Sequence, residues 1–126
     1  MTTLTPQRPS VTAGAATPSF VAATAADKFA VPTGGGSYML YYKNGATPTT
    51  TLWILNTNAV APIGSTPAAA TGATNWEDVL LKSVVGASAD CVCFVDDVSP
   101  YVDVTGFVNL KHNTPTTLTV AVFGPF

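Results

Sequence analysis

Residues 106–123, GFVNLKHNTPTTLTVAVF, decide the fold class of this chain. Apolar and polar residues alternate more cleanly in the second half of the stretch than elsewhere in the chain, which predicts a strand with one buried face. We expect the buried face to consist of Leu118, Val120 and Val122, and the outer face of Thr117 and Thr119.

The first half of the stretch alternates in the same way, with Val108, Leu110 and the terminal His112 on one face and Asn109 and Lys111 on the other. Residues 113–115, Asn-Thr-Pro, separate the two halves. Asn tolerates a left-handed conformation and Pro fixes its own φ, so both favour a turn. The two strands are therefore predicted to pair as a tight hairpin.

The same pattern of short runs extends back to Pro18. Runs rich in β-branched and aromatic residues alternate there with Gly, Pro, Asn and Thr, and they occupy residues 18–24, 37–43, 49–56, 79–85, 90–98, 106–112 and 116–123. About seven short strands at intervals of about ten residues are typical of a small antiparallel β-sandwich or barrel. We expect one all-β domain over residues 18–126.

The sequence of residues 74–85 is compatible with either a helix or a strand. Thr74 to Glu77 fits a helix capping box, whereas residues 79–85, VLLKSVV, are rich in β-forming residues. A strand is favoured. The preceding loop, residues 57–75, is long for a compact domain, and loops of that length commonly bind a ligand or are disordered.

Residues 1–17 are rich in Thr, Ala and Pro and contain almost no large apolar side chain. Such a segment buries too little surface to fold by itself. We expect it to be flexible or to become ordered on a partner.

Charge is unusually sparse, because charged residues make up 10% of the chain against about 25% in a typical soluble domain. The five cations, Arg8, Lys28, Lys43, Lys82 and Lys111, are scattered singly. Binding to duplex nucleic acid needs clustered cations, so no nucleic-acid partner is expected. A surface with few charges is poorly protected from association, which favours a protein that lives in an assembly.

No run approaches the about 18 consecutive apolar residues that a membrane span requires. Residues 1–18 also lack a cationic region followed by an apolar one, as in a secretory signal. We expect no membrane partner and synthesis in the cytoplasm.

Candidate catalytic and metal-binding residues are few. No serine or cysteine motif pairs with His112, which is expected to be solvated at a strand end, so no enzyme activity and no catalytic residue is predicted. Asp96, Asp97 and Asp103 offer oxygen ligands for a hard cation. Their spacing fits no calcium loop, and an ordinary solvated turn is preferred. Asp27 is expected to close a turn or cap a strand end.

Three further features have a structural interpretation in preference to a functional one. Cys91 and Cys93 point to the same face of a strand, which disfavours a mutual disulfide and favours two buried thiols, with an interchain disulfide as the alternative. Residues 32–36, PTGGG, lead into a strand rather than a phosphate-binding helix. Aromatic residues are expected in the core and at interfaces, with a sugar-binding face as the alternative; they include Tyr38, Tyr41, Tyr42, Trp53, Trp76 and Tyr101. We expect no cofactor and no metal.

Three segments together resemble the capsid decoration (cement) proteins of tailed bacteriophages: AATAADKF at 22–29, YYKNGATPTTTLWIL at 41–55 and TGFVNLKHNTPTTLTVAVFGP at 105–125. Those proteins share an Ala/Thr lead-in, a Gly-Asp-x-Phe turn, a strand that ends in Lys-Asn-Gly/Thr, and a closing hairpin. Here Ala26 replaces the Gly of the turn, and residues 57–90 have no counterpart in the pattern.

The resemblance implies a jelly-roll-like β-sandwich or β-tulip domain, assembled as a homotrimer on the outside of the expanded phage head. It implies the major capsid protein as the partner, an extended N-terminal arm over residues 1–17, and no catalytic residue. The candidate capsid or subunit contacts are Thr5, Pro6, Arg8, Pro9, Val11 and Phe20. The alternative is a receptor-binding domain of a phage tail or fibre that recognises a glycan through the aromatic residues and the 57–75 loop.

Overall fold

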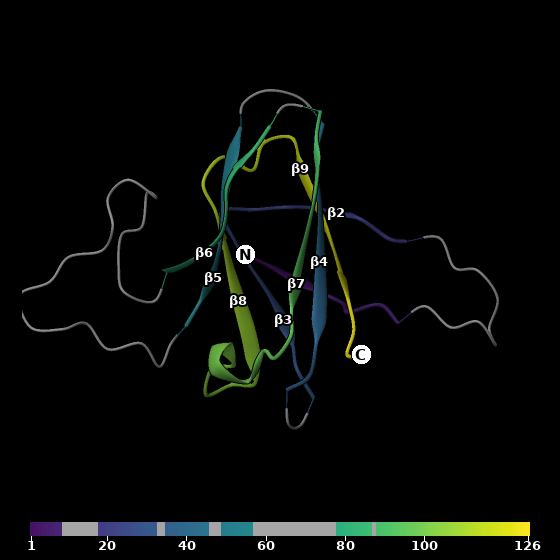
Figure 1. Cartoon of the computed structure of the whole chain (residues 1–126), viewed down its shortest axis with the longest axis vertical. Helices are drawn as coiled ribbons and strands as arrows, with labels where there is room; N and C mark the ends of the chain where they lie inside the picture. The colour runs from purple at the N-terminus through teal and green to yellow at the C-terminus, as the bar shows by residue number, and fades with distance from the viewer. Residues whose placement is uncertain (9–17, 33–34, 46–48, 57–77, 87) are drawn as a thin grey trace, which may run out of the picture.

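The computed structural model describes residues 1–8, 18–32, 35–45, 49–56, 78–86 and 88–126. Within these ranges the chain forms strands that stack as two layers (Figure 1). The strands are β1 (Thr2–Leu4), β2 (Val21–Ala22), β3 (Ala26–Ala30), β4 (Tyr38–Asn44), β5 (Thr50–Leu55), β6 (Asp78–Val85), β7 (Asp90–Val95), β8 (Phe107–His112) and β9 (Leu118–Phe123), and a 3-10 turn covers Ser99–Tyr101. This architecture confirms the small all-β sandwich, and each of the seven predicted runs overlaps a strand.

The two layers differ in size. Sheet A has five strands in the order β1-β3-β8-β5-β6, and sheet B has four in the order β2-β9-β4-β7. Neighbouring strands are antiparallel, except that β1 runs parallel to β3. Successive strands along the chain mostly lie in different sheets, so that most connections pass from one sheet to the other.

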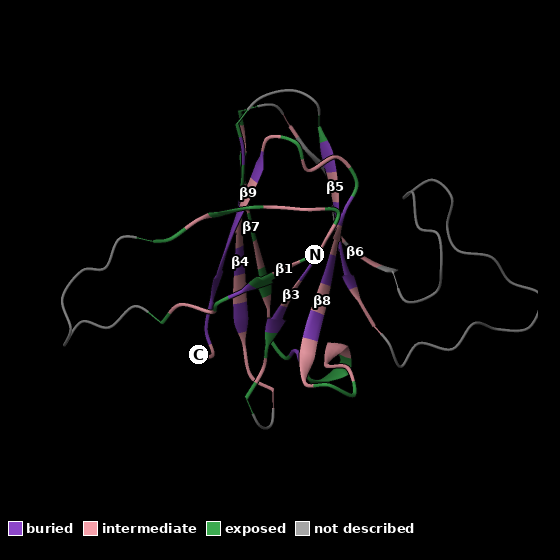
Figure 2. Ribbon diagram, turned by 180° about the vertical axis from the view of Figure 1, so that it is seen from behind, coloured by how far each residue is buried: buried purple, intermediate pink, exposed green. Residues whose placement is uncertain are grey.

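The core lies between the sheets and follows the predicted alternation. On β8 the inward side chains of Val108 and Leu110 are buried, and on β9 those of Leu118, Val120 and Val122 are buried. Figure 2 shows the same alternation as bands along β4, where inward residues are buried and outward ones are not. Full burial of one large apolar side chain stabilises a fold by about 1.5–3 kcal/mol, so these faces hold the layers together.

The predicted hairpin between residues 106–112 and 116–123 is wrong. Strand β8 pairs with β3 and β5 in sheet A, whereas β9 pairs with β2 and β4 in sheet B. Residues 113–117 therefore carry the chain across the edge of the sandwich, with the amide of Leu118 donating to the carbonyl of Pro115 at 3.0 Å. The inward faces of the two strands meet across the core rather than lying side by side in one sheet.

The start of the chain also differs from the expectation of a flexible or partner-ordered arm. Residues Thr2–Leu4 form β1 on β3 of the same chain, and Leu4 is buried in the core. The physical reason is that residues 26–30, where Asp27 was expected to close a turn or cap a strand end, form strand β3, and the edge of β3 pairs with the first residues of the chain. Of the 1–17 segment, residues 9–17 lie outside the described ranges.

Residues 78–85 form a strand, as favoured, and β6 pairs with β5. The competing helix start at Thr74 to Glu77 and the loop 57–75 both lie outside the described residues.

Candidate functional site

The N-terminal residues 2–8, which we call the strap, connect the two sheets along one side of the sandwich. Its first part is β1 at the edge of sheet A. Its last part reaches sheet B, where the Gln7 amide donates to the Val122 carbonyl at 2.8 Å and the Gly124 amide donates to the Gln7 carbonyl at 2.8 Å. Both ends of the strap are thus fixed by backbone hydrogen bonds.

A side-chain clamp holds the strap against the chain that enters β2. The Gln7 side chain donates through Nε2 to the Ser19 carbonyl and accepts through Oε1 from the Ser19 amide, both at 2.7 Å. Between the strap and β9 lies a groove of about 320 Å³, lined by Thr3, Leu4, Thr5, Gln7, Ser19, Val21, Val120, Ala121 and Val122. The strap therefore presents a preformed surface.

The structure brings together only part of the predicted contact set. Thr5 and Arg8 are exposed on the strap and Pro6 is half-buried there. Pro9 and Val11 lie outside the described residues. Phe20 lies outside the strap, directly after Ser19, and contacts the outer face of sheet B.

Phe20 packs on the outer face of sheet B through an aromatic contact. Its ring lies 5.3 Å from that of Tyr41 in an edge-to-face arrangement, and the Lys43 ammonium lies 4.5 Å from the Phe20 centroid. The Tyr41 hydroxyl donates to Asp90 at 2.7 Å. This hydrogen bond is the main reason why the pKa of Tyr41 is raised.

Further along the same face, apolar side chains are open to solvent. Val92 and Phe94 on β7 are 53% and 57% exposed, and Phe126 is 62% exposed with its ring stacked 6.3 Å from that of Phe94. Contiguous exposed apolar surface on a soluble domain commonly marks an interaction site. The outer face of sheet B is therefore the strongest candidate for contact with a partner.

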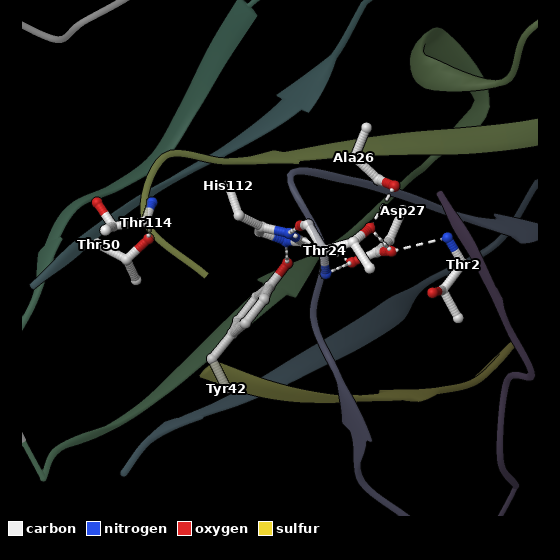
Figure 3. A network of polar contacts seen from close by, with 8 residues as sticks. All are labelled: Thr2, Thr24, Ala26, Asp27, Tyr42, Thr50, His112 and Thr114. Atoms are coloured by element: carbon white, nitrogen blue, oxygen red, sulfur yellow. Dashed lines mark hydrogen bonds and ion pairs between the residues drawn. The ribbon is translucent and has the colours of Figure 1, made fainter. Parts of the chain in front are cut away.

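The prediction of a solvated His112 is wrong, because its side chain is buried at the end of β8 (Figure 3). Nδ1 lies 2.7 Å from the carbonyl oxygen of Thr24, and Nε2 lies 3.0 Å from the hydroxyl of Tyr42. A carbonyl only accepts, so Nδ1 carries the proton and Nε2 accepts from Tyr42. The residue joins β8 of sheet A to β4 of sheet B and to the β2–β3 crossover.

Asp27 supports the same cluster from β3. Its carboxylate accepts from the Thr24 amide at 2.8 Å, the Thr24 hydroxyl at 2.5 Å and the Thr2 amide at 3.0 Å, and it lies 3.4 Å from His112 Nδ1. The expected turn-closing role is correct in part, because Asp27 does hold the residues before it. Its position inside a strand and its complete burial were not expected.

Burial determines the protonation states of this cluster. Desolvation lowers the pKa of His112, although the Thr24 carbonyl and Asp27 act in the opposite direction, and the lowered pKa favours the neutral imidazole. Desolvation also raises the pKa of Tyr42 well above its usual value. Asp27, His112 and Tyr42 are all buried, so a substrate has no direct access to them. The arrangement connects the two sheets through polar contacts.

The acidic residues near the 3-10 turn are occupied by neighbouring donors. Asp97 accepts from the amide and hydroxyl of Ser99, which lowers its pKa. Burial alone would raise the pKa of Asp103, but hydrogen bonds from Thr105, Asn109 and Phe107 outweigh it and hold the pKa well below the usual range. These contacts are those of an ordered turn. Within the described ranges, no three His, Cys, Asp or Glu side chains gather as metal ligands would.

The cysteines and lysines also take structural positions. The thiols of Cys91 and Cys93 point to the same side of β7 with their sulfur atoms 3.6 Å apart, half-buried against the core and outside any disulfide. Three lysine ammonium groups lie over aromatic rings, 4.2–5.0 Å from the ring centroids: Lys28 over Phe107, Lys43 over Phe20 and Lys111 over Trp53. Positive charge is therefore distributed singly over both outer faces.

Most of the aromatic residues fill the fold, as expected. Tyr38, Tyr42 and Trp53 are buried, whereas Tyr41 and Tyr101 are half-buried. Trp76 lies outside the described residues.

No family model, curated protein or solved structure matches this chain. In the part of the chain that the structure describes, no helix is long and apolar enough to cross a membrane.

Proposed function

We propose that this chain is a structural virion protein that binds the outer surface of a tailed-phage capsid and stabilises the expanded head. Its partners are the major capsid protein and further copies of itself, and its place is the capsid exterior. The observation that carries the proposal is the solvent-open apolar strip on sheet B, made of Val92, Phe94 and Phe126, in a chain with very little charge. A surface of this kind suits permanent contact with other subunits.

The polar side chains support a structural role in preference to a catalytic one. The polar atoms of His112, Asp27 and Tyr42 bind one another in the contacts that join the two sheets. Asp97 accepts from Ser99, and Asp103 accepts from Thr105 in its own turn and from Asn109 on β8. General acid–base chemistry needs such groups within reach of a substrate, and here they serve the fold.

The strap supports the proposal through its rigidity. Its exposed residues Thr5 and Arg8 lie on a backbone that is fixed at both ends, so binding through them orders little additional chain. Preorganised contact surfaces lose less free energy on association than flexible ones. The strap thus takes the place of the extended arm that the resemblance implies.

Stabilisation of the head follows from linkage. A protein that binds only the expanded shell shifts the equilibrium toward that shell. Several copies held together multiply weak individual contacts into strong attachment. A small domain without chemistry of its own is sufficient for this role.

The glycan-binding alternative receives little support from the fold. Three of its six candidate aromatic residues, Tyr38, Tyr42 and Trp53, are buried. We therefore treat it as an outcome of the test rather than as a second proposal.

The test is co-sedimentation of the purified chain with expanded heads and with unexpanded precursor heads. We expect saturable binding to expanded heads only. The double variant Thr5→Glu, Arg8→Glu places two like charges on the strap, and we expect at least about a tenfold loss of affinity. Such a loss corresponds to about 1.4 kcal/mol, which is less than the substitution of one hot-spot residue of an interface commonly costs. Val104→Glu is the matched control, because Val104 is fully exposed in a turn after β7.

Binding of the control but not of the double variant supports the proposal. Failure of the wild-type chain to bind expanded heads, or binding of host-surface glycan in a parallel titration, contradicts it.

A further inference from the structure

Strand β7 is the outermost strand of sheet B on the side away from the strap. The direction of its backbone groups follows from one hydrogen bond, in which the Asn44 amide donates to the Ala89 carbonyl at 2.9 Å. In an antiparallel ladder, hydrogen-bonded and non-hydrogen-bonded pairs alternate. Cys91 and Cys93 therefore direct their backbone groups toward β4, and Asp90, Val92 and Phe94 direct theirs outward.

The outward edge of β7 carries few of the features that protect natural edge strands. Proline, lysine and bulges usually prevent an exposed edge from pairing with another chain. The sequence of β7, DCVCFV, has neither proline nor lysine, and its register with β4 is uninterrupted from Asp90 to Val95. Its only charge is that of Asp90, at the first position.

The side chains of β7 also favour this edge as a contact surface. Cys91 and Cys93 face the core but remain half-exposed. On the opposite face, Val92 and Phe94 are more than half exposed, and Phe126 extends the apolar strip. Within the described ranges, no strand pairs along this edge.

We propose that β7 pairs antiparallel with β7 of a second copy of this chain, about a two-fold axis through Val92. The occupant is a second copy because this register is self-complementary. Val92 then meets Val92 of the partner, and Asp90 meets Phe94 of the partner. The backbone groups of these three residues form three hydrogen-bonded pairs, and the two four-stranded sheets become one continuous sheet.

Side-chain direction, strand length and charge together select this register among the symmetric ones. Axes through Val92 and Cys93 keep more residues of Asp90–Val95 paired than axes nearer the strand ends do, and charge distinguishes these two. Opposed residues must point to the same face, so the axis passes through a residue rather than between two residues. An axis through Cys93 would place Asp90 opposite Asp96 of the partner, and like charges that face each other across strands are destabilising. The axis through Val92 avoids that contact.

Disulfide formation between the two cysteines can test this register. About the Val92 axis, Cys91 of each copy lies opposite Cys93 of the other in a non-hydrogen-bonded pair. The Cα atoms of such a pair are about 4.5 Å apart, within the range that a disulfide spans. Diamide takes up the two electrons and two protons that each pair of thiols loses as the S–S bond forms, so it can trap the contact.

The first test measures the molar mass of the full chain by sedimentation across a concentration series. We expect wild type to reach twice the chain mass of 12.9 kDa. Val92→Lys places two lysines opposite each other at the axis and should return the protein to the single-chain mass. Val104→Lys, at a fully exposed valine in the turn before β8, should not. Thermal unfolding monitored by circular dichroism verifies that each variant is folded.

The second test oxidises the native protein with diamide and analyses it without reducing agent. We expect a covalent dimer in wild type and its loss in both Cys91→Ser and Cys93→Ser, because each disulfide needs one residue of each kind. A dimer that survives Cys91→Ser overturns the register. A trimeric mass, a single-chain mass at all concentrations, or a dimer unaffected by Val92→Lys overturns the pairing.

These outcomes are independent of capsid binding. A trimer would contradict the β7 contact and leave the proposed function intact, because a two-fold contact that joins identical edges generates pairs. If the chain forms the dimer but does not bind expanded heads, the β7 contact stands and the proposed function is contradicted.

Discussion

Tyr42→Phe tests whether the buried cluster around His112 holds the two sheets together. The substitution removes one oxygen atom and leaves the ring in place, so the core packing is unchanged. Tyr42 is completely buried on β4, and its hydroxyl lies 3.0 Å from His112 Nε2. Without that donor, a buried ring nitrogen loses its hydrogen-bond partner.

The expected loss in the free energy of unfolding is about 1–3 kcal/mol, which is the usual penalty for leaving a buried polar group unsatisfied. For a chain of this length, each kcal/mol corresponds to a decrease in Tm of about 4 °C. The measurement is urea unfolding at pH 8, where His112 is neutral in both the folded and the unfolded chain.

Tyr38→Phe is the matched control on the same strand. Tyr38 is also completely buried on the inner face of β4, but within the described residues its hydroxyl has no hydrogen-bond partner. Removing it should leave the stability unchanged or increase it. If Tyr42→Phe lowers the free energy of unfolding no more than Tyr38→Phe does, the hydrogen bond between Tyr42 and His112 does not stabilise the contact between the sheets.

Three other predictions concern stability. Leu4→Ala should lower the free energy of unfolding by about 2–5 kcal/mol in chemical denaturation, because Leu4 belongs to the core. A change near zero would contradict the packing of the strap against the core. Gly124→Ala should lower Tm, because Gly124 has φ +136° and an added Cβ would lie 2.8 Å from the Ser37 carbonyl oxygen; an unchanged Tm would contradict this geometry. Because the pKa of His112 is lowered on folding, the unfolded chain binds the proton first as the pH falls below about 6.5, and stability should be complete above that pH and decrease below it. A pH series of unfolding free energies measures this slope, and His112→Gln should remove it; a slope that persists in the variant would exclude His112 as its source.

The faces of the strands could be predicted from the sequence, but their partners could not. Alternation places Val108, Leu110, Leu118, Val120 and Val122 inward, and the structure confirms all five. The same alternation is compatible with a hairpin in one sheet and with a crossover between two sheets, because both point the apolar residues to the core. Turn chemistry at residues 113–115 fits either connection, so the sheet order could not be predicted.

The burial of His112 could be predicted from the alternation of its strand, although its position at the strand end led to the wrong prediction that it is solvated. His112 falls on the inward face with Val108 and Leu110, which is the signal of burial. Its partners Thr24 and Tyr42 lie 88 and 70 residues away in sequence, so no local motif connects them. Strand β3 was missed for a similar reason. Asp27 disfavours a strand unless its carboxylate has donors, and those come from Thr2 and Thr24 only in the folded chain.

Exposure on an edge strand is another property that a sequence alone does not determine. The run DCVCFV fits a central strand as well as an edge strand. Only the order of sheet B shows that Val92 and Phe94 face solvent next to an edge. The surface on which both proposals rest therefore comes from the fold.

The most direct test of the proposed function is electron microscopy of the virions that carry this chain, combined with mass-spectrometric counting of its copies. The proposal predicts many copies arranged with the symmetry of the head, on the outside of the expanded shell. A few copies confined to the tail would contradict capsid decoration.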